Sequence, residues 1–257
     1  MFDELRLKEA LVQYKKDFVP THWKNEKYKW EAVKYFQDNW DINAADFAGM
    51  LERSLSKTYN LLASVNNFPA GMITSFAKTA PEEVRAMFME LFDESKEVYE
   101  RINTFKMKSS ILLEKYGNGA GQHYQYENAI TTYLWLRYPD TYYVYKFGEV
   151  QKAAEELGSN YQFKKGAYAD NIRSFIIISK ENVGAIHFPF LFPCLLRNYE
   201  YYGTTETPSG YFSPPKLSRY ARLYQVFRAF VFFKCKPHNW HIFANISISQ
   251  PCVVVKS

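Results

Sequence analysis

Apolar residues recur at helical spacing through the first 180 positions of this 257-residue chain, and this repeat limits the possible fold more than any other feature. The clearest example is the set Phe47, Met50, Leu51, Leu55, Thr58 and Leu62, which follows the i, i+3, i+4, i+7 pattern of a helix with one buried face. Proline, glycine and asparagine interrupt the repeat at intervals, as they do between helices. The pattern predicts helices over 5–18, 25–40, 47–62, 79–92, 94–116, 126–138 and 149–157.

Helix start and stop signals support this division. Asn43 is the predicted N-cap of the third helix, with Asp46 three residues later in the position of a capping-box acid. Residues 141–146 are rich in aromatic and β-branched residues and predict a short strand. Residues 171–180 are apolar enough for a buried helix or a buried strand. The predicted fold class is mostly α: a multi-helix domain with at most one short strand or hairpin, followed by an irregular tail.

The character of the sequence changes near Lys180, which predicts a helical domain over 1–180 and an atypical basic tail over 181–257. Residues 1–181 hold 24 Lys and Arg against 25 Asp and Glu, whereas residues 182–257 hold eight against two. The tail also contains seven of the eleven prolines and all three cysteines. Its apolar residues cluster without a sustained period, except over 217–233, where a basic amphipathic helix is predicted.

Motifs for catalysis and for cofactor binding are absent from the sequence. It has no GxxxxGK[ST] loop, no GxGxxG after a strand, no HExxH and no GxSxG. Pro139-Asp140 is not followed by the acid-x-Lys triplet of restriction-type nucleases, and it is typical of a helix stop and turn. Cys235, His238 and His241 lack a fourth metal ligand nearby. We therefore expect a non-catalytic protein with no cofactor and no metal.

Signals for export or for membrane insertion are also missing. The N-terminus is charged from its third residue and has no apolar signal core. The longest apolar stretch, 183–196, is too short to span a bilayer and contains two prolines. The first 193 residues have no cysteine, and no CxxC pair occurs, which is typical of a reducing compartment. We expect a cytoplasmic location and no membrane partner.

Basic residues lie beside aromatic ones in several segments, a combination found on surfaces that bind nucleic acid. The same segments also suit solvated helix faces or exposed turns above an aromatic core, so both interpretations stay open. The candidate nucleic-acid contacts are Lys24, Lys27, Lys29, Arg137, Lys146, Lys164 and Lys165. The net charge of +5 lies in the tail, so any nucleic-acid surface in the first 180 residues has to be a local patch.

Aromatic residues form 18% of the chain, enough for both a core and a stacking surface. A pocket able to hold an extruded base needs flat side chains on more than one side of that base. The candidates for such an aromatic pocket are Trp30, Tyr124, Tyr126, Trp135 and Tyr142. An aromatic core is the alternative interpretation of the same residues.

Four segments together resemble the N-terminal region of bacterial McrB-like AAA+ proteins, the NTP-driven subunits of modification-dependent restriction systems. They are EKYKWEAVKYFQDNWD (26–41), LSKTYNLLAS (55–64), MFMELFDESKEVYERI (87–102) and HYQYENAITTYLWLRYPDTYYVYKF (123–147). The resemblance runs from about residue 10 to about residue 178, with KKGAYADN (164–171) near its end. It implies a target-recognition domain that binds duplex DNA carrying a modification, coupled to a GTPase or ATPase motor and a separate nuclease subunit. It implies no catalytic residue in this region.

After about Ile176 the sequence departs from that family's pattern, in which a charged helical segment leads on to the motor domain. We interpret the tail as the product of a frameshift or premature truncation of a longer gene. The predicted function is therefore a non-catalytic DNA-recognition domain of a McrB-like restriction ATPase or GTPase, separated from its motor. The alternative is a helical protein-interaction or regulatory module without nucleic-acid binding.

Overall fold

The computed structural model describes residues 2–17, 20 and 23–185, and within these ranges it contains helices and no β-strand. The elements in chain order are α1 (Glu4–Asp17), α2 (Trp23–Glu26), α3 (Tyr28–Asn39), α4 (Phe47–Leu55), the short 3-10 helix η2 (Tyr59–Leu61), α5 (Pro69–Thr79), α6 (Pro81–Leu91), α7 (Val98–Tyr116), α8 (Glu127–Arg137), α9 (Phe147–Glu156) and α10 (Tyr168–Ala185). The predicted mostly helical fold is confirmed.

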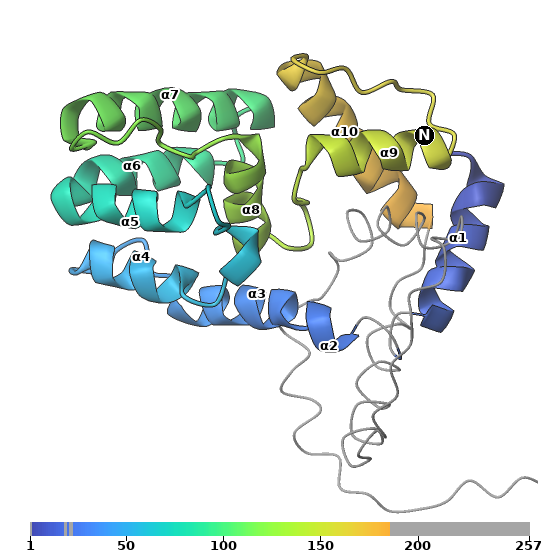
Figure 1. Ribbon diagram of the computed structural model, residues 1–257, viewed down its shortest axis with the longest axis horizontal. Helices are drawn as coiled ribbons and strands as arrows, with labels where there is room; N and C mark the ends of the chain where they lie inside the picture. Colours follow the sequence, from blue (N-terminus) through green and yellow to red (C-terminus); the bar gives the residue numbers. More distant parts are fainter. Residues whose placement is uncertain (1, 18–19, 21–22, 186–257) are drawn as a thin grey trace, which may run out of the picture.

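Helices α3 to α7 form a stack in which each helix packs against the next along the chain, as Figure 1 shows on the left. Helix α8 runs across one side of this stack and packs against α3 at one end and α7 at the other. Helices α9, α10 and α1 lie on the far side of α8 from the stack (Figure 1). Helix α8 is therefore the central element of the domain.

The sequence of α8 explains its central position. Its residues from Ala129 to Leu136 are all buried, so the helix is covered on every side. The Phe88 ring of α6 packs against α8 through Tyr133, with their centroids 5.3 Å apart. Phe88 also contacts Trp40 and Phe105, each at 5.2 Å between ring centroids. Edge-to-face pairs of this kind add to the apolar burial, so most of the unusual aromatic content of this region is core.

The predicted strand over 141–146 is not a strand in the structure. Tyr142, Tyr143, Val144 and Tyr145 are all buried, and the described part of the chain offers no neighbouring strand for backbone pairing. Tyr143 and Tyr145 both pack edge-on against Phe175 of α10. The aromatic and β-branched composition of this segment reflects its burial. Such a composition is typical of strands, but it does not show whether a neighbouring strand is present.

The observed helices differ from the predicted ones in several places. The N-cap of α4 is Asp46, whose carboxylate accepts the Gly49 amide at 2.9 Å, so the predicted cap at Asn43 is wrong. Helix α5 was not predicted, because the proline at its first position reads as a chain break although proline is favoured there. Residues 171–180, ambiguous in the sequence, lie within α10 and are helical. The predicted boundary near Lys180 falls inside α10, and the predicted helix over 217–233 lies outside the described residues.

Candidate functional site

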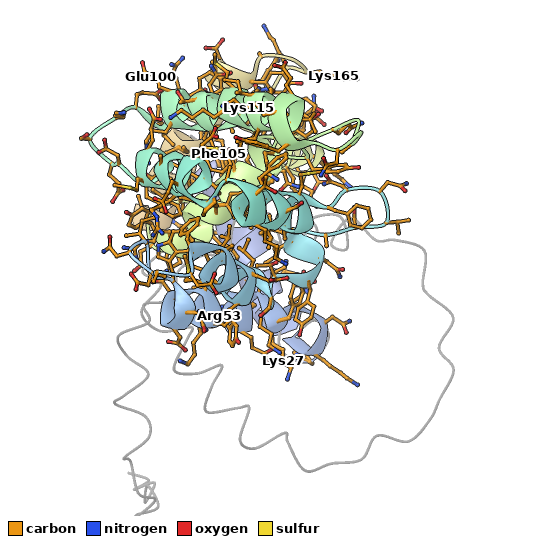
Figure 2. The ribbon with its side chains drawn as sticks, turned by 90° about the vertical axis from the view of Figure 1, so that its left-hand side faces the viewer. Lys27, Arg53, Glu100, Phe105, Lys115 and Lys165 are labelled. Atoms are coloured by element: carbon orange, nitrogen blue, oxygen red, sulfur yellow. The ribbon has the colours of Figure 1, made fainter. Side chains whose placement is uncertain are left out.

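The predicted basic residues do not form one surface. Figure 2 shows Lys27 and Lys165 at opposite ends of the molecule, so a single patch cannot contain both. Lys24 is exposed beside Lys27, but Lys29 is buried and its ammonium group lies 2.6 Å from the Glu26 carboxylate. A buried, paired lysine is not placed to contact phosphate. The predicted basic residues therefore include one group around Lys24 and Lys27 and a separate group around Lys165.

The two remaining predicted cations hold local contacts. The Arg137 guanidinium lies 5.2 Å from the ring centroid of Tyr138. The backbone carbonyl of Arg137 accepts a hydrogen bond from the side-chain amide of Gln37 at 2.8 Å. Gln37 belongs to α3, so this contact joins the end of α8 to a helix about a hundred residues earlier. The Lys146 ammonium lies 3.4 Å from the Glu149 carboxylate, an exposed pair. The contacts of Arg137 and Lys146 are therefore local, and neither residue needs a ligand to explain its position.

The five predicted pocket aromatics do not line one pocket. Trp135 and Tyr142 are 2% and 5% exposed and belong to the core. The Tyr142 hydroxyl accepts the Arg101 guanidinium at 2.6 Å and donates to Glu94 at 3.0 Å. Trp30 is half-buried and packs against the core. A shared aromatic pocket is therefore the wrong arrangement, and the core interpretation holds for these three residues.

Tyr124 and Tyr126, the other two, lie together in the segment that leads into α8. Tyr126 is exposed and its ring lies 5.0 Å from the ring of His123. Tyr124 adopts a positive φ of 58°, unusual for a bulky residue, and its ring packs edge-on against Phe68. This segment therefore presents two tyrosines from a fixed backbone.

A buried hydrogen-bond network fixes that backbone. The Gln125 side-chain amide donates to the Pro69 carbonyl at 2.8 Å, and its oxygen accepts the Tyr133 hydroxyl at 2.8 Å. The Gln125 backbone amide donates to Nδ1 of His123 at 2.9 Å, which requires that nitrogen to be unprotonated. Burial lowers the pKa of His123, and the positive charge of Lys106 lowers it further. The imidazole is thus held neutral.

The strongest candidate site is the turn before α10, formed by Lys164, Lys165 and Gly166. Gly166 adopts a φ of 86°, which glycine tolerates at no steric cost. Buried Asn171 clamps the turn: its amide donates to the Lys164 carbonyl at 2.7 Å, and its oxygen accepts the Lys164 amide at 3.2 Å. Both lysines are exposed, and neither has a carboxylate partner among the described residues. The turn therefore has a fixed backbone and presents two lysine side chains that are not paired with described carboxylates.

The surroundings of this turn add to its positive character. It precedes the N-terminus of the 18-residue α10, whose macrodipole attracts anions, although Asp170 in the first turn offsets part of that effect. Tyr168, the first residue of α10, is 48% exposed, and the Lys106 ammonium lies 5.0 Å from its ring centroid. Lys106 also pairs with buried Glu127 at 2.7 Å. We call Lys106, Lys164, Lys165 and Tyr168 the α10 turn site.

Tyr145 lies behind the α10 turn site. Burial raises the pKa of Tyr145 to about 12, and its hydroxyl has no hydrogen-bond partner among the described residues. The carboxylate of Glu127 raises the same pKa further. The Tyr161 hydroxyl donates to the Asn171 oxygen at 3.2 Å, so Asn171 serves both the turn and this layer. The Tyr145 phenol therefore adds no charge beside the site at neutral pH.

Sequence reasoning missed Asn171, Lys106 and Glu127. Asn171 appears in the sequence as one polar residue of an apolar run, and nothing in its spacing links it to Lys164. Lys106 and Glu127 are 21 residues apart in the chain and meet only because α7 packs against α8. Among the candidates, the structure brings together Lys164 and Lys165 on one turn and Tyr124 and Tyr126 on one segment.

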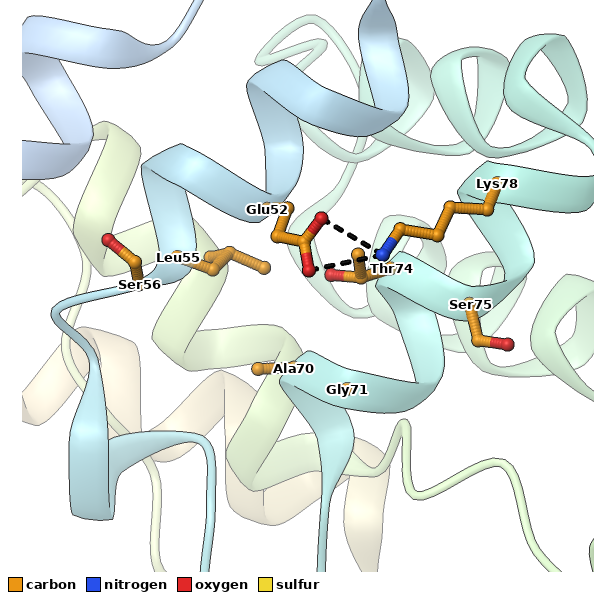
Figure 3. A pocket seen from close by; sticks show the side chains of 8 residues that line it. All are labelled: Glu52, Leu55, Ser56, Ala70, Gly71, Thr74, Ser75 and Lys78. Atoms are coloured by element: carbon orange, nitrogen blue, oxygen red, sulfur yellow. Dashed lines mark hydrogen bonds and ion pairs between the residues drawn. The ribbon is translucent and has the colours of Figure 1, made fainter.

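A groove lies between α4 and α5 (Figure 3), and Figure 1 shows these two helices on the other side of α8 from α10. Its volume is about 450 Å³, and it is lined by Glu52, Leu55, Ser56, Ala70, Gly71, Thr74, Ser75 and Lys78. The Lys78 ammonium lies 2.9 Å from the Glu52 carboxylate and crosses the groove, as Figure 3 shows. The small side chains of α5 keep the groove open.

Among the residues that the structure describes, no three His, Cys, Asp or Glu side chains gather in a way that would hold a metal ion. No helix in the same ranges is long and apolar enough to cross a membrane.

Comparison of the chain with protein-family models, with curated proteins and with solved structures finds no match. The function therefore has to be inferred from the geometry of the site together with the resemblance of the segments quoted above.

Proposed function

We propose that the helical domain is a non-catalytic DNA-recognition domain, similar in role to the N-terminal region of McrB-like restriction ATPases and GTPases. Its ligand is duplex DNA, which that resemblance further implies to carry a base modification. The observation that carries the proposal is the α10 turn site, where two lysines without acidic partners project from a backbone clamped by Asn171.

Phosphate is the chemistry that such a site recognises. Exposed lysines act as point charges for the DNA backbone, and a helix N-terminus adds partial positive charge beside them. Tyr168 and Tyr126 are exposed aromatic side chains and offer flat surfaces for contact with sugar or base. Because Asn171 fixes the Lys164 backbone before any ligand arrives, binding costs little ordering of the turn.

The test is the salt dependence of binding to methylated and unmethylated duplexes. Each phosphate contact contributes about −0.9 to the slope of log K against log salt concentration. Replacing both lysines (K164Q/K165Q) is expected to weaken binding to all duplexes and to reduce the size of that slope by about 2. Fluorescence anisotropy at several salt concentrations measures both quantities.

The matched control is K24Q/K27Q, which removes the same charge elsewhere; Figure 2 shows Lys27 at the opposite end of the domain from Lys165. This control is expected to leave affinity and slope unchanged. If it weakens binding while K164Q/K165Q does not, the α10 turn site is the wrong surface although the domain binds DNA. If the intact protein binds no duplex at low salt, DNA recognition is wrong, and a protein-interaction or regulatory module is the better interpretation.

A further inference from the structure

The groove between α4 and α5 contains hydrogen-bonding groups that the protein itself leaves unused. Thr74 is 7% exposed, yet its hydroxyl has no hydrogen-bond partner among the described residues. Figure 3 shows that hydroxyl turned into the groove, beside the Glu52–Lys78 pair and not bonded to it. The hydroxyl oxygen is open to the groove and is used by no described protein group, so a ligand there can accept its hydrogen bond.

The N-terminus of α5 opens into the same groove. α5 is an 11-residue helix capped by Phe68, which has no side-chain acceptor for the first amides. Ala70 and Met72 donate their amides to the carbonyls of Leu62 and Phe68, but the Gly71 amide between them has no partner in the described ranges. A helix start with an unused amide favours negative charge.

Gly71 also provides the space for a ligand. A Cβ atom added at Gly71 would meet no atom within 4 Å, so the groove is open at this point. Ser56 of α4 and Ser75 of α5 also line the groove, and Figure 3 shows their hydroxyls turned away from Thr74. Lys78 lies two helical turns along α5 and supplies the cation.

We propose that this groove binds an oxyanion, a carboxylate or phosphoryl group, at the N-terminus of α5. The Gly71 amide and the Thr74 hydroxyl donate hydrogen bonds to it, and Lys78 supplies the charge. Glu52 competes with the ligand for Lys78, and this competition is weak because the pair is more than half exposed. The inference does not depend on DNA recognition, since it concerns a different surface.

The experiment titrates the full chain with sodium phosphate, with sodium acetate and with a short duplex, each against sodium chloride at equal ionic strength. The readouts are the amide resonance of Gly71 and the methyl resonance of Thr74. Saturable shifts at both residues are expected with at least one oxyanion. Shifts with phosphate or acetate identify a small-molecule site, whereas shifts with the duplex alone identify a second contact with a DNA backbone. The absence of a saturable shift at these two residues overturns the proposal.

Substitutions sharpen the test. Thr74→Val keeps the shape and removes the hydroxyl, and it is expected to weaken oxyanion binding about tenfold. Thr79→Val is the matched control on the same helix, since its hydroxyl bonds to the Ser75 carbonyl outside the groove; it is expected to leave binding unchanged. Glu52→Gln removes the competing carboxylate and is expected to tighten binding by about two- to threefold. Equal effects of the two threonine substitutions, or weaker binding by E52Q, would mean that the ligand is not an anion held at Thr74.

Discussion

The side-chain amide of Asn171 donates to the backbone carbonyl of Lys164 at 2.7 Å, and its side-chain oxygen accepts the amide of the same residue at 3.2 Å. One side chain thereby replaces the backbone partner that a neighbouring strand would provide. The α10 turn site depends on this pairing, because it fixes the direction in which Lys164 and Lys165 leave the surface.

Replacing Asn171 by Ala is expected to cost about 1–2 kcal/mol of unfolding free energy, because the partly buried amide and carbonyl of Lys164 both lose their partner. Urea unfolding measures this cost, and hydrogen exchange at the Lys164 amide is expected to become faster. DNA affinity is expected to fall as well, even though both lysines remain. Asn60→Ala, at an exposed position, is the control and should change none of the three quantities.

Stability is expected to fall as the pH drops below about 6.5, the ordinary pKa of an unfolded histidine. Burial and Lys106 lower the pKa of His123 in the folded state, so the unfolded chain binds the extra proton more readily. The stabilisation that neutral His123 contributes is complete above pH 6.5. It is lost as the pH falls toward the lowered pKa of His123 in the folded state. His123→Asn keeps an acceptor for the Gln125 amide, so it should flatten this dependence when urea midpoints are compared between pH 7.5 and 5.5. An unchanged slope in that variant would assign the dependence to other groups.

Tyr133→Phe is expected to destabilise the domain by about 1–2 kcal/mol, because the Gln125 side-chain oxygen loses its donor in a buried site. This substitution leaves the shape of the core unchanged, so the loss of unfolding free energy measures the contribution of the Tyr133–Gln125 hydrogen bond. Tyr126→Phe is the matched control, since Tyr126 is exposed and its hydroxyl lies outside this network. Chemical denaturation of the two variants in parallel gives the comparison.

Asp46→Ala is expected to cost about 1 kcal/mol, the usual value for losing a helix N-cap. Asn43→Ala is expected to have little effect, because Asn43 is exposed and caps nothing in the structure. Thermal unfolding of both variants tests the choice between these two residues. A larger loss for Asn43→Ala would restore the cap predicted from the sequence.

Most helices of this fold could be predicted because they bury one face each and therefore leave a regular apolar period; α5 was missed, and α10 was left open between helix and strand. α8 was also predicted, although every face of it is buried, because Pro139 and the glycines before it mark its limits. The segment 141–146 was misassigned because its composition records only burial. Composition does not record whether a second strand lies beside the segment.

The site could be predicted only in part. Lys164 and Lys165 are adjacent in the chain, so their common location needed no tertiary information. Lys29 was chosen for its charge, and its burial against Glu26 depends on how α2 meets α3. Asn171, which holds the turn, is seven residues from its partner, and no sequence rule connects an asparagine at that distance to a lysine backbone.

The position of α8 has a consequence for the order in which the protein can fold. Helix α3 leaves the ribosome about a hundred residues before the carbonyls of Leu136 and Arg137 that Gln37 binds. At about 5–20 residues per second, the face of α3 that packs against α8 has to wait roughly 5–20 seconds for that helix. During that interval this face of α3 lacks its partner, so chaperone binding to it is expected to be strongest on nascent chains that end before α8.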